Sequence, residues 1–355
     1  TVDPAATPTP TPLPPSPDAA AGLFLDAWEA RDYAAMYARL SPHRQASIDA
    51  DAFAQRYRQE HNTASVLTVT ADLQSVMWEG DGAQAAFRIR LDTSLAGTLI
   101  TDTVMSLSLH GGAWWIDWEP GLIWPQLSAD RYFRMDYTIP IRANIYDRNG
   151  LGLAAQGVIV TVGVIPGQIE DEDGVLQALA TVTDLTREEI KSKYAESPAD
   201  WKVPIADISG ETSVEYNDRL SVPGIYRDEK DGRTYPRHGV APHVVGWVSP
   251  VPAEKLDAYR AKGYRGDEWV GVSGLEAWGE EILAGKHGGE LSIVTASGER
   301  VTTVAKSDAF PSRAIYTTID RNLQEQVEEI LGGRKGAIVV MDVDTSLDRD
   351  SIARV

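Results

Sequence analysis

The hydrophobic pattern changes its period early in the chain, and this change restricts the possible fold more than any other feature. Within residues 21–41 apolar side chains recur at helical spacing, with Phe24 and Trp28 on one face and Asp32 placed to cap a second turn. Between residues 87 and 109 the period becomes two, as in strands with one buried face. The pattern therefore predicts helices followed by an antiparallel sheet.

The alternating segments also predict where the sheet turns. Phe87, Ile89 and Leu91 alternate with arginines, and Gly111 and Gly112 can supply the positive φ angles of a hairpin that leads into a tryptophan-rich strand. Helices packed on a curved antiparallel sheet form an α+β cone. We expect this cone to occupy residues 19–127.

Composition excludes several kinds of function. A chain of 355 residues is long enough for two or three domains. Its net charge of -19 argues against nucleic acid as a partner, and the absence of cysteine removes disulfides and thiolate chemistry. The six histidines include no H-E-x-x-H motif, so we expect no metal and no cofactor.

The chain begins with alternating threonine and proline. Residues 1–18 are expected to form an extended, polyproline-like tether, although an ordinary disordered terminus would have a similar composition. No apolar stretch approaches the length of a membrane helix, so membrane attachment is expected only through an N-terminal anchor absent from this sequence.

Acidic runs suggest calcium sites at first sight. The runs are Glu170 to Asp173 and a later set, Asp342, Asp344, Asp348 and Asp350. Neither has the spacing or the terminal glutamate of a calcium loop. We interpret both as solvated charge.

Three short strings follow the expected cone, and the first is RANIYDRNGLGLA, from Arg142 to Ala154. Apolar positions flank Asp147, Arg148, Asn149 and Gly150, a composition suited to a tight turn between two strands. A simple hairpin is the plain interpretation.

The second string is RTYPRHGVAPHVVGWVSP, from Arg233 to Pro250, and it also contains Tyr235. Pro236 and Gly239 should interrupt the chain, and residues 244–248 are expected to form a short buried strand that is broken at Gly246, where a neighbour must come close. His243 could be a ligand or a base, but a structural hydrogen-bond donor is the expectation because it has no partner at metal-ligand spacing.

The third string is GVSGLEAWGEEILAGKHGG, from Gly271 to Gly289. Ser273 and Glu276 have capping-box spacing, and Gly285 should end the helix. The apolar helix stripe is expected to consist of Leu275, Trp278, Ile282 and Leu283. Glu276, Glu280 and Glu281 could form a carboxylate cluster, but helix capping and a solvated face explain them more simply.

Together these strings resemble the three motifs of the penicillin-binding protein dimerisation domain, the pedestal that carries a transpeptidase. The preceding cone resembles the NTF2-like domain found before some penicillin-binding proteins, including the methicillin-resistance type. One departure is that Ala143 follows Arg142 where the motif usually has glycine. The resemblance implies a set of packed, ion-paired residues that link the pedestal to the catalytic domain: Arg142, Asp147, Arg148, Arg233, Gly274 and Glu276.

The segment after residue 312 resembles the opening of the transpeptidase domain. Asp320 is a plausible cap for a helix with Val327 and Ile330 on its apolar face, and residues 337–341 are apolar enough for a central strand. The family pattern stops after Thr345. We therefore divide the chain into four segments: 1–18, a tether; 19–127, the cone; 128–312, the pedestal; and 313–355, the start of the transpeptidase.

The catalytic motifs of the family are absent from this sequence. No serine has lysine three residues later, and neither Ser-x-Asn nor Lys-Thr-Gly occurs. The resemblance thus implies the non-catalytic front part of a class B penicillin-binding protein, outside the cytoplasmic membrane, that positions a missing C-terminal transpeptidase domain.

Partners and alternatives follow from the same resemblance. Peptidoglycan and proteins of cell-wall division or elongation are the expected partners. A second hypothesis is an allosteric module that binds peptidoglycan or a protein. A third makes the cone an isomerase or lyase, which would need a deep pocket with a desolvated carboxylate and not a cone filled by Phe87, Trp114 and Trp118.

Overall fold

The structure is a computed structural model that describes residues 16–183, 185–236, 239–341 and 353–354. Its contacts define two compact units, which are considered separately. The described residues of the first unit are 16–139, 253–266 and 287–310. The second unit contains the described residues within 140–252, 267–286 and 311–354.

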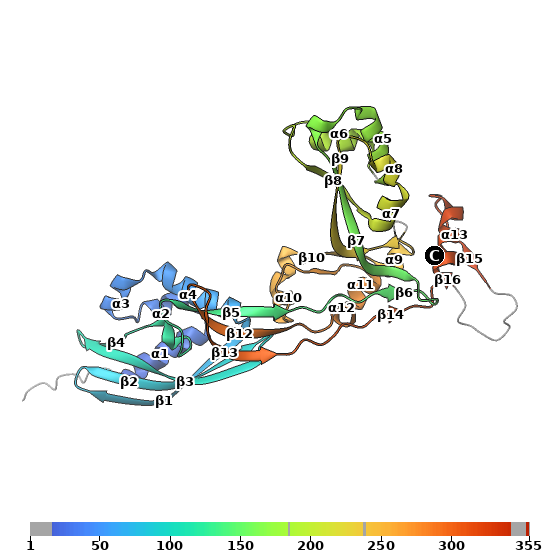
Figure 1. Cartoon of the computed structure of the whole chain (residues 1–355). Coiled ribbons are helices and arrows are strands. Elements are labelled where there is room, and N and C mark those ends of the chain that lie inside the picture. The colour runs from blue at the N-terminus through green and yellow to red at the C-terminus, as the bar shows by residue number, and fades with distance from the viewer. Residues whose placement is uncertain (1–15, 184, 237–238, 342–352, 355) are drawn as a thin grey trace, which may run out of the picture. The chain divides into compact units, whose positions relative to one another are not determined.

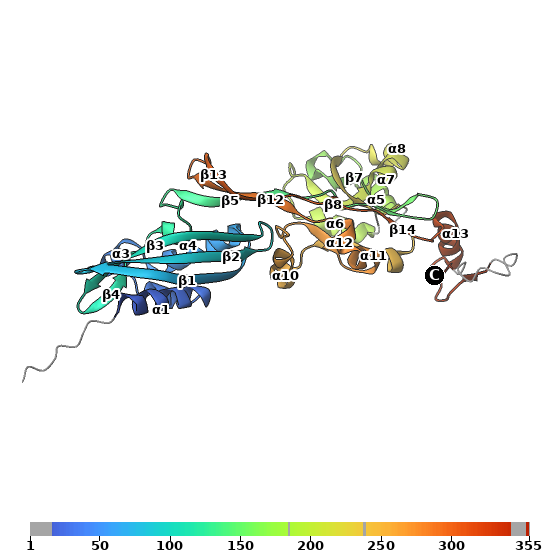
Figure 2. The ribbon, with the colours of Figure 1, turned by 90° about the horizontal axis from the view of Figure 1, so that it is seen from below.

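The first unit begins with helices and continues with strands (Figures 1 and 2). Its helices are α1 (Pro17–Glu29), α2 (Tyr33–Tyr37), α3 (Pro42–Ser47), α4 (Ala50–Thr63) and α10 (Leu256–Ala261), with 3-10 turns at Pro120–Leu122 and Ala253–Lys255. Its strands are β1 (Val66–Glu79), β2 (Gly82–Thr93), β3 (Thr98–His110), β4 (Ala113–Ile116), β5 (Arg131–Thr138), β12 (Gly288–Thr295) and β13 (Arg300–Ser307).

The predicted sheet is the antiparallel ladder β1-β2-β3-β4. Gly111 and Gly112 adopt φ angles of 61° and 77° in the turn from β3 to β4, so the expected hairpin is confirmed. Helix α1 contacts β1, β2 and β4, which places it on the apolar face of the sheet. The α+β class predicted for the chain is confirmed.

Aromatic side chains fill the space between the helices and this sheet. Trp28, Phe53, Tyr57 and Phe87 are fully buried, and Trp118 is buried beside them. The Phe53 and Trp118 rings have centroids 5.0 Å apart, and Trp118 Nε1 donates to the Tyr57 hydroxyl at 3.0 Å. Packing of this kind opposes the isomerase or lyase hypothesis, which requires an open interior.

A second sheet of the first unit has the order β13-β12-β5. Helix α4 contacts β5, where the buried Glu60 accepts a hydrogen bond from the Phe133 backbone N–H at 2.8 Å. Leu291 and Ile293 of β12 belong to the same apolar core as Trp28. The two sheets of this unit therefore share one core.

The second unit is built around a sheet of order β14-β6-β7-β8, in which β9 also pairs with β7. Its strands are β6 (Ile145–Tyr146), β7 (Gly152–Val164), β8 (Val203–Ser209), β9 (Ile225–Thr234), β10 (Val248–Pro250), β11 (Trp269–Gly271), β14 (Ile315–Tyr316), β15 (Val339–Val340) and β16 (Ala353–Arg354). Its helices are α5 (Glu172–Val182), α6 (Arg187–Tyr194), α7 (Gly210–Glu215), α8 (Asn217–Leu220), α9 (Pro242–Val245), α11 (Gly274–Trp278), α12 (Glu280–Leu283) and α13 (Arg321–Leu331), with a 3-10 turn at Pro166–Gln168.

Two apolar clusters stabilise the second unit. One lies where α5, α6 and α8 gather beside the strands β8 and β9, and includes Val162, Leu179 and Ile190 (Figure 1). The other includes Ile145 and Leu283. The first short string forms the antiparallel pair β6 and β7 that its composition predicts.

Two strand predictions are wrong. Residues 242–245 form the helix α9, and only residues 248–250 form a strand; Val244 and Trp247 are 43% and 52% exposed. The apolar run of residues 337–341 contains only the two-residue strand β15, whose Val339 is 65% exposed. β15 pairs only with β16 among the described strands, so no sheet buries it on both sides.

Some expectations fall on residues that the structure does not describe. These are most of the tether, the acidic set that begins at Asp342, and the departure from the family pattern after Thr345. The boundaries expected at residues 127 and 312 stay predictions, because the contact units are discontinuous in sequence. Within the described ranges, no helix is both long enough and apolar enough to cross a membrane.

Candidate functional site

The three strings meet in a buried group of charged side chains within the second unit. Arg142, just before β6, donates from Nε and Nη2 to Glu276 Oε2 at 2.9 and 2.7 Å, and from Nη1 to Glu280 Oε2 at 2.8 Å. Arg233, in β9, donates from Nε to Glu276 Oε1 at 2.7 Å, and the Tyr235 hydroxyl donates to the same oxygen at 3.2 Å. We call these five residues the Arg142 cluster.

Burial makes the pairing within the Arg142 cluster necessary. The Glu276 side chain is fully buried, and those of Arg142, Arg233 and Glu280 are 9%, 5% and 11% exposed. Two guanidinium groups face two carboxylates, so the formal charges balance. A buried charge that loses its partner is strongly destabilising, whereas a balanced group can be accommodated.

The electrostatics of the cluster follow from this arrangement. Burial, reinforced by the neighbouring Glu276 carboxylate, raises the pKa of Tyr235. Although burial opposes it, the charges of Glu280 and Glu276 raise the pKa of Arg142. Tyr235 therefore stays neutral and Arg142 stays charged at neutral pH, which is the behaviour of groups that hold a structure and not of acid–base catalysts.

Two glycines bring the second and third strings into backbone contact. Gly246 has a φ of 78°, and a Cβ atom on it would lie 1.9 Å from the Ser273 carbonyl oxygen. Gly274 has a φ of 56°, and its Cβ would lie 2.5 Å from the Val244 carbonyl oxygen. The close approach expected at Gly246 is confirmed, and it positions Glu276 at the start of α11.

The interpretation of the third string as one capped helix with a solvated acidic face is wrong. Ser273 makes no side-chain capping bond, and the Glu276 carboxylate accepts from the arginines. Helix α11 ends before Gly279, α12 follows, and Trp278 is 72% exposed instead of buried. Glu280 also accepts from the Gly271 backbone N–H, so only Glu281 of the three carboxylates is exposed.

A second group of contacts surrounds Asp147, which is fully buried. Its Oδ1 accepts from the backbone N–H groups of Asn149 and Leu151, each at 2.7 Å. Its Oδ2 accepts at 3.0 Å from the backbone N–H of Arg321, the first residue of α13. Burial opposes ionisation, but the N–H donors of Arg321, Leu151 and Asn149 hold the pKa of Asp147 below its ordinary value.

The start of α13 makes further bonds to the same turn. The exposed Arg148 donates from its backbone N–H to the Ile319 carbonyl at 2.8 Å and from Nε to the Thr318 carbonyl at 3.1 Å. Asp320 caps α13 by accepting from the Leu323 N–H. Asn149 Nδ2 lies 3.3 Å from Asp320 Oδ2, and Gly150 takes the positive φ of 80° that closes the turn.

The other predicted residues lie apart from these two groups. Gly239 donates its N–H to the Pro236 carbonyl and has a φ of 97°, and Gly285 has a φ of 68° after α12. Leu275 packs on the apolar cluster that contains Leu283. His243 is exposed on α9 and makes no hydrogen bond to a described residue, so the expected structural donor is not found.

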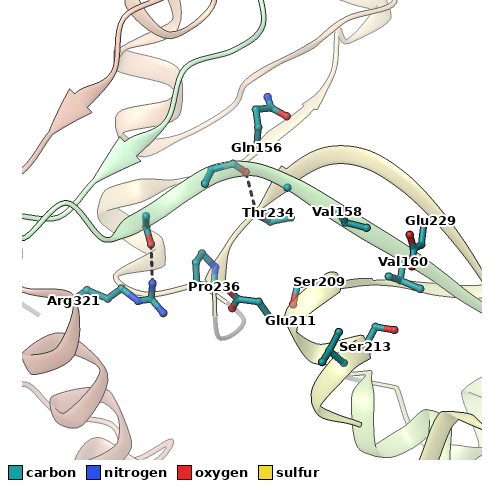
Figure 3. Close-up of a pocket in the computed structure, with 15 residues that line it drawn as sticks. Gln156, Val158, Val160, Ser209, Glu211, Ser213, Glu229, Thr234, Pro236 and Arg321 are labelled. Atoms are coloured by element: carbon teal, nitrogen blue, oxygen red, sulfur yellow. Dashed lines mark hydrogen bonds between the residues drawn. The ribbon is translucent and has the colours of Figure 1, made fainter. Parts of the chain in front are cut away.

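A cavity of about 500 Å³ in the second unit lies beside the start of α13. Figure 3 shows Arg321 reaching toward β7, where its Nη1 donates to the Gly152 carbonyl at 3.3 Å. Ser209 and Ser213 line this cavity, but none of the described residues of its lining is a histidine or lysine that could activate them. Among the described residues, no group of histidine, aspartate and glutamate side chains could hold a metal ion.

Three residues of these groups are not predicted by the sequence. Its pattern places Glu280 on a solvated face, and neither Arg321 nor Gly271 carries a local signal for the contacts that it makes. The spacing of Glu276 and Glu280, four residues apart, was the available signal, because both then lie on one side of a helical turn. Nothing local indicated that Arg142, far away in sequence, would face them.

Comparison with known families agrees with this architecture. The model of the penicillin-binding protein dimerisation domain matches residues 137–317, and that of the NTF2-like N-terminal transpeptidase domain matches residues 16–131. The chain therefore belongs to the penicillin-binding protein dimerisation domain family, and an NTF2-like N-terminal transpeptidase domain precedes that domain in the chain.

Individual relatives give the same assignment. The chain is 26% identical to penicillin-binding protein 3 of Bacillus subtilis (strain 168) over 340 residues, which are 93% of this chain and 50% of the relative. It is 29% identical to the peptidoglycan D,D-transpeptidase MrdA of Escherichia coli (strain K12) over 218 residues, 58% of this chain and 34% of the relative. The chain thus spans half or less of the length of these curated relatives.

One solved structure is also similar, a complex between penicillin-binding protein PBP2 and MreC from Helicobacter pylori. The sequence identity is 23%, the TM-score is 0.35, and the match covers 59% of this chain and 41% of that chain. A score this low supports no structural comparison.

Proposed function

We propose that this chain is the part of a peptidoglycan D,D-transpeptidase that holds and orients the catalytic domain during cell-wall cross-linking, outside the cytoplasmic membrane. The family membership and the MrdA relatives, which are peptidoglycan D,D-transpeptidases, support the reaction class. The partners proposed for the whole protein are peptidoglycan and other cell-wall proteins.

The observation that carries the proposal is the Asp147 carboxylate. It joins the turn of the first string to the first N–H of α13, in the segment that resembles the start of the transpeptidase. A buried charged acceptor that accepts three backbone N–H groups fixes the direction in which α13 leaves the sheet, because charge-assisted bonds are stronger than neutral ones. Glu328 Oε1 holds α13 at a second point by accepting from the Ala241 N–H at 2.9 Å.

We further propose that the chain itself performs no acyl transfer. The sequence lacks Ser-x-x-Lys, Ser-x-Asn and Lys-Thr-Gly, so no serine has the lysine that activates the nucleophile. Incubation with a fluorescent penicillin, followed by denaturing electrophoresis, tests this point. We expect no labelled band from this chain. Bacillus subtilis penicillin-binding protein 3 is the positive control and should be labelled. Covalent labelling of this chain would contradict the proposal.

A further inference from the structure

A polar cavity in the first unit differs in charge from the rest of the protein. It has a volume of about 540 Å³, within the range of small-molecule sites. Arg31, Arg260 and Arg265 line it, whereas Asp257 is the only acidic residue among the described residues of its lining. In a chain of net charge -19, a cavity with an excess of guanidinium groups should attract anions locally.

The charge of two of these arginines is not neutralised by carboxylates. Arg31 Nη2 donates to the Val66 and Leu67 carbonyl oxygens at 3.0 and 2.8 Å, which are neutral acceptors. Arg260, on α10, forms no ion pair with any residue in the described part of the chain. The Arg31 bonds hold its guanidinium in place and still leave its positive charge available to a ligand.

His61 forms a neutral part of the cavity wall. It is 4% exposed and accepts a hydrogen bond at Nε2 from Trp28 Nε1 at 3.3 Å. Burial, with a further contribution from the Arg31 charge, lowers the pKa of His61 to about 3. Its ring therefore carries no charge at neutral pH, and the positive potential comes from the arginines.

The backbone is strained at the same place. The non-glycine residues with positive φ among the described residues are Arg31, Ser65 and Ala241, and the first two, at 56° and 54°, line this cavity. Strained non-glycine residues persist where the surrounding structure requires them, and they concentrate at binding sites. The Tyr137 side chain also lines the cavity, and its hydroxyl has no partner in the described part of the chain.

We propose that this cavity binds an oxyanion, a carboxylate or a phosphate carried by a small polar ligand. The Arg31 and Arg260 guanidinium groups would pair with the anion, since guanidinium matches the geometry of both groups, and Tyr137 would donate a neutral hydrogen bond. The site belongs to the first unit alone and does not depend on the proposed function.

The test uses the whole chain and two probes, which distinguish a phosphate-bearing ligand from a carboxylate-bearing ligand. Pyrophosphate represents a phosphate-bearing ligand and succinate a carboxylate-bearing ligand. Binding is measured by isothermal titration calorimetry at low salt and located by amide chemical shifts in nuclear magnetic resonance spectra. We expect saturable binding of at least one probe, with shifts among residues 61–67 and 257–265, and the probe that binds more tightly identifies the source.

Variants that change the charge of the cavity test whether the probes bind there. Arg260→Gln should weaken binding by about tenfold, the usual effect of losing one charge-assisted hydrogen bond. Lys306→Gln on β13 makes the same change of charge outside the cavity and should leave binding unchanged. Arg31→Lys keeps the charge at the strained position but loses the planar fork, and should weaken binding without unfolding the unit. No binding of either probe, or equal weakening by Arg260→Gln and Lys306→Gln, would overturn the proposal.

Discussion

Glu276 illustrates how a single buried carboxylate can organise residues from three distant strings. Arg142 and Arg233 both donate to it, and its side chain is fully buried. The cluster is balanced only while both carboxylates are ionised. The contribution of the Arg142 cluster to stability is therefore measured by the free energy of unfolding that is lost when one of its charged side chains is removed. The net stabilisation by the intact ion pairs is a different and smaller quantity.

Replacing Glu276 by glutamine tests this description. The change leaves an excess positive charge among buried side chains, and we expect the free energy of unfolding of the second unit to fall by about 3 to 5 kcal/mol. Urea unfolding followed by hydrogen exchange of each unit measures the loss. Glu329→Gln, at an exposed position on α13 without a partner among the described residues, should change stability by less than about 0.5 kcal/mol. A similar small effect of Glu276→Gln would contradict the description.

His61 gives the first unit a defined pH dependence. Its folded-state pKa of about 3 lies below the ordinary value of 6.5, so the folded state binds fewer protons than the unfolded chain between these values. The stability contributed by His61 is present above pH 6.5 and decreases as the pH falls toward 3, by about 1.4 kcal/mol per pH unit. Glu60, whose pKa is raised by burial, acts in the opposite direction.

Comparison with His61→Gln isolates this effect, because glutamine can still accept the Trp28 hydrogen bond. We expect the variant to show a flatter decline of first-unit stability between pH 6.5 and 4.5 than the parent chain, measured by hydrogen exchange of the α4 amides. Parallel declines in the two proteins would show that His61 is protonated in the folded state.

The turns next to the helices α9 and α11 depend on close backbone contacts that only glycine permits. Gly246→Ala would place a Cβ atom 1.9 Å from the Ser273 carbonyl oxygen, so α9 and α11 must separate. We expect the second unit to lose more than about 2 kcal/mol of stability. Gly150→Ala is a matched control, since Gly150 has a similar φ of 80° but open space around its Cβ position, and should cost about 1 kcal/mol. Stability is measured by urea unfolding. Equal losses in the two variants would mean that the positive φ angle, and not the contact with Ser273, determines the loss of stability.

Elements with local signals could be predicted from the sequence. Asp32 caps α2 as predicted, and the capping box of Thr186 and Glu189, which begins α6, is a local signal of the same kind. The alternation around Phe87 gave the correct face of β2, because a two-residue period is decided by neighbours in sequence. The hairpin of the first string also required only local turn chemistry.

The errors arose where partners distant in sequence decide the structure. A glutamate in capping-box spacing with Ser273 bonded arginines from two other strings instead, and no local pattern distinguishes these outcomes. The run around Val244 has strand-like composition, but Pro242 begins a helix that places Val244 and Trp247 on the surface. The residue types of the Arg142 cluster are visible in the sequence, whereas the convergence of Arg142, Arg233 and Glu276 is implied only by the family resemblance and not by any local pattern.

At the scale of the whole molecule, the chain leaves the first unit after residue 139 and returns to it twice. A division by sequence order therefore does not follow the contacts, and each unit can be assigned its own stability. We propose that the second unit has the orienting role, because its Asp147 carboxylate connects the turn after β6 with the first turn of α13.

Hydrogen exchange of the α13 amides in the parent chain and in Asp147→Asn tests this role most directly. Asparagine keeps the size of the side chain but removes its negative charge. It also has only one oxygen, so it cannot replace both carboxylate oxygens that accept the N–H groups of Asn149, Leu151 and Arg321. We expect faster exchange at residues 321–325 in the variant, with unchanged exchange in the first unit. Unaltered protection at the start of α13 would mean that Asp147 does not hold this helix, and the proposed orienting function would lose its support.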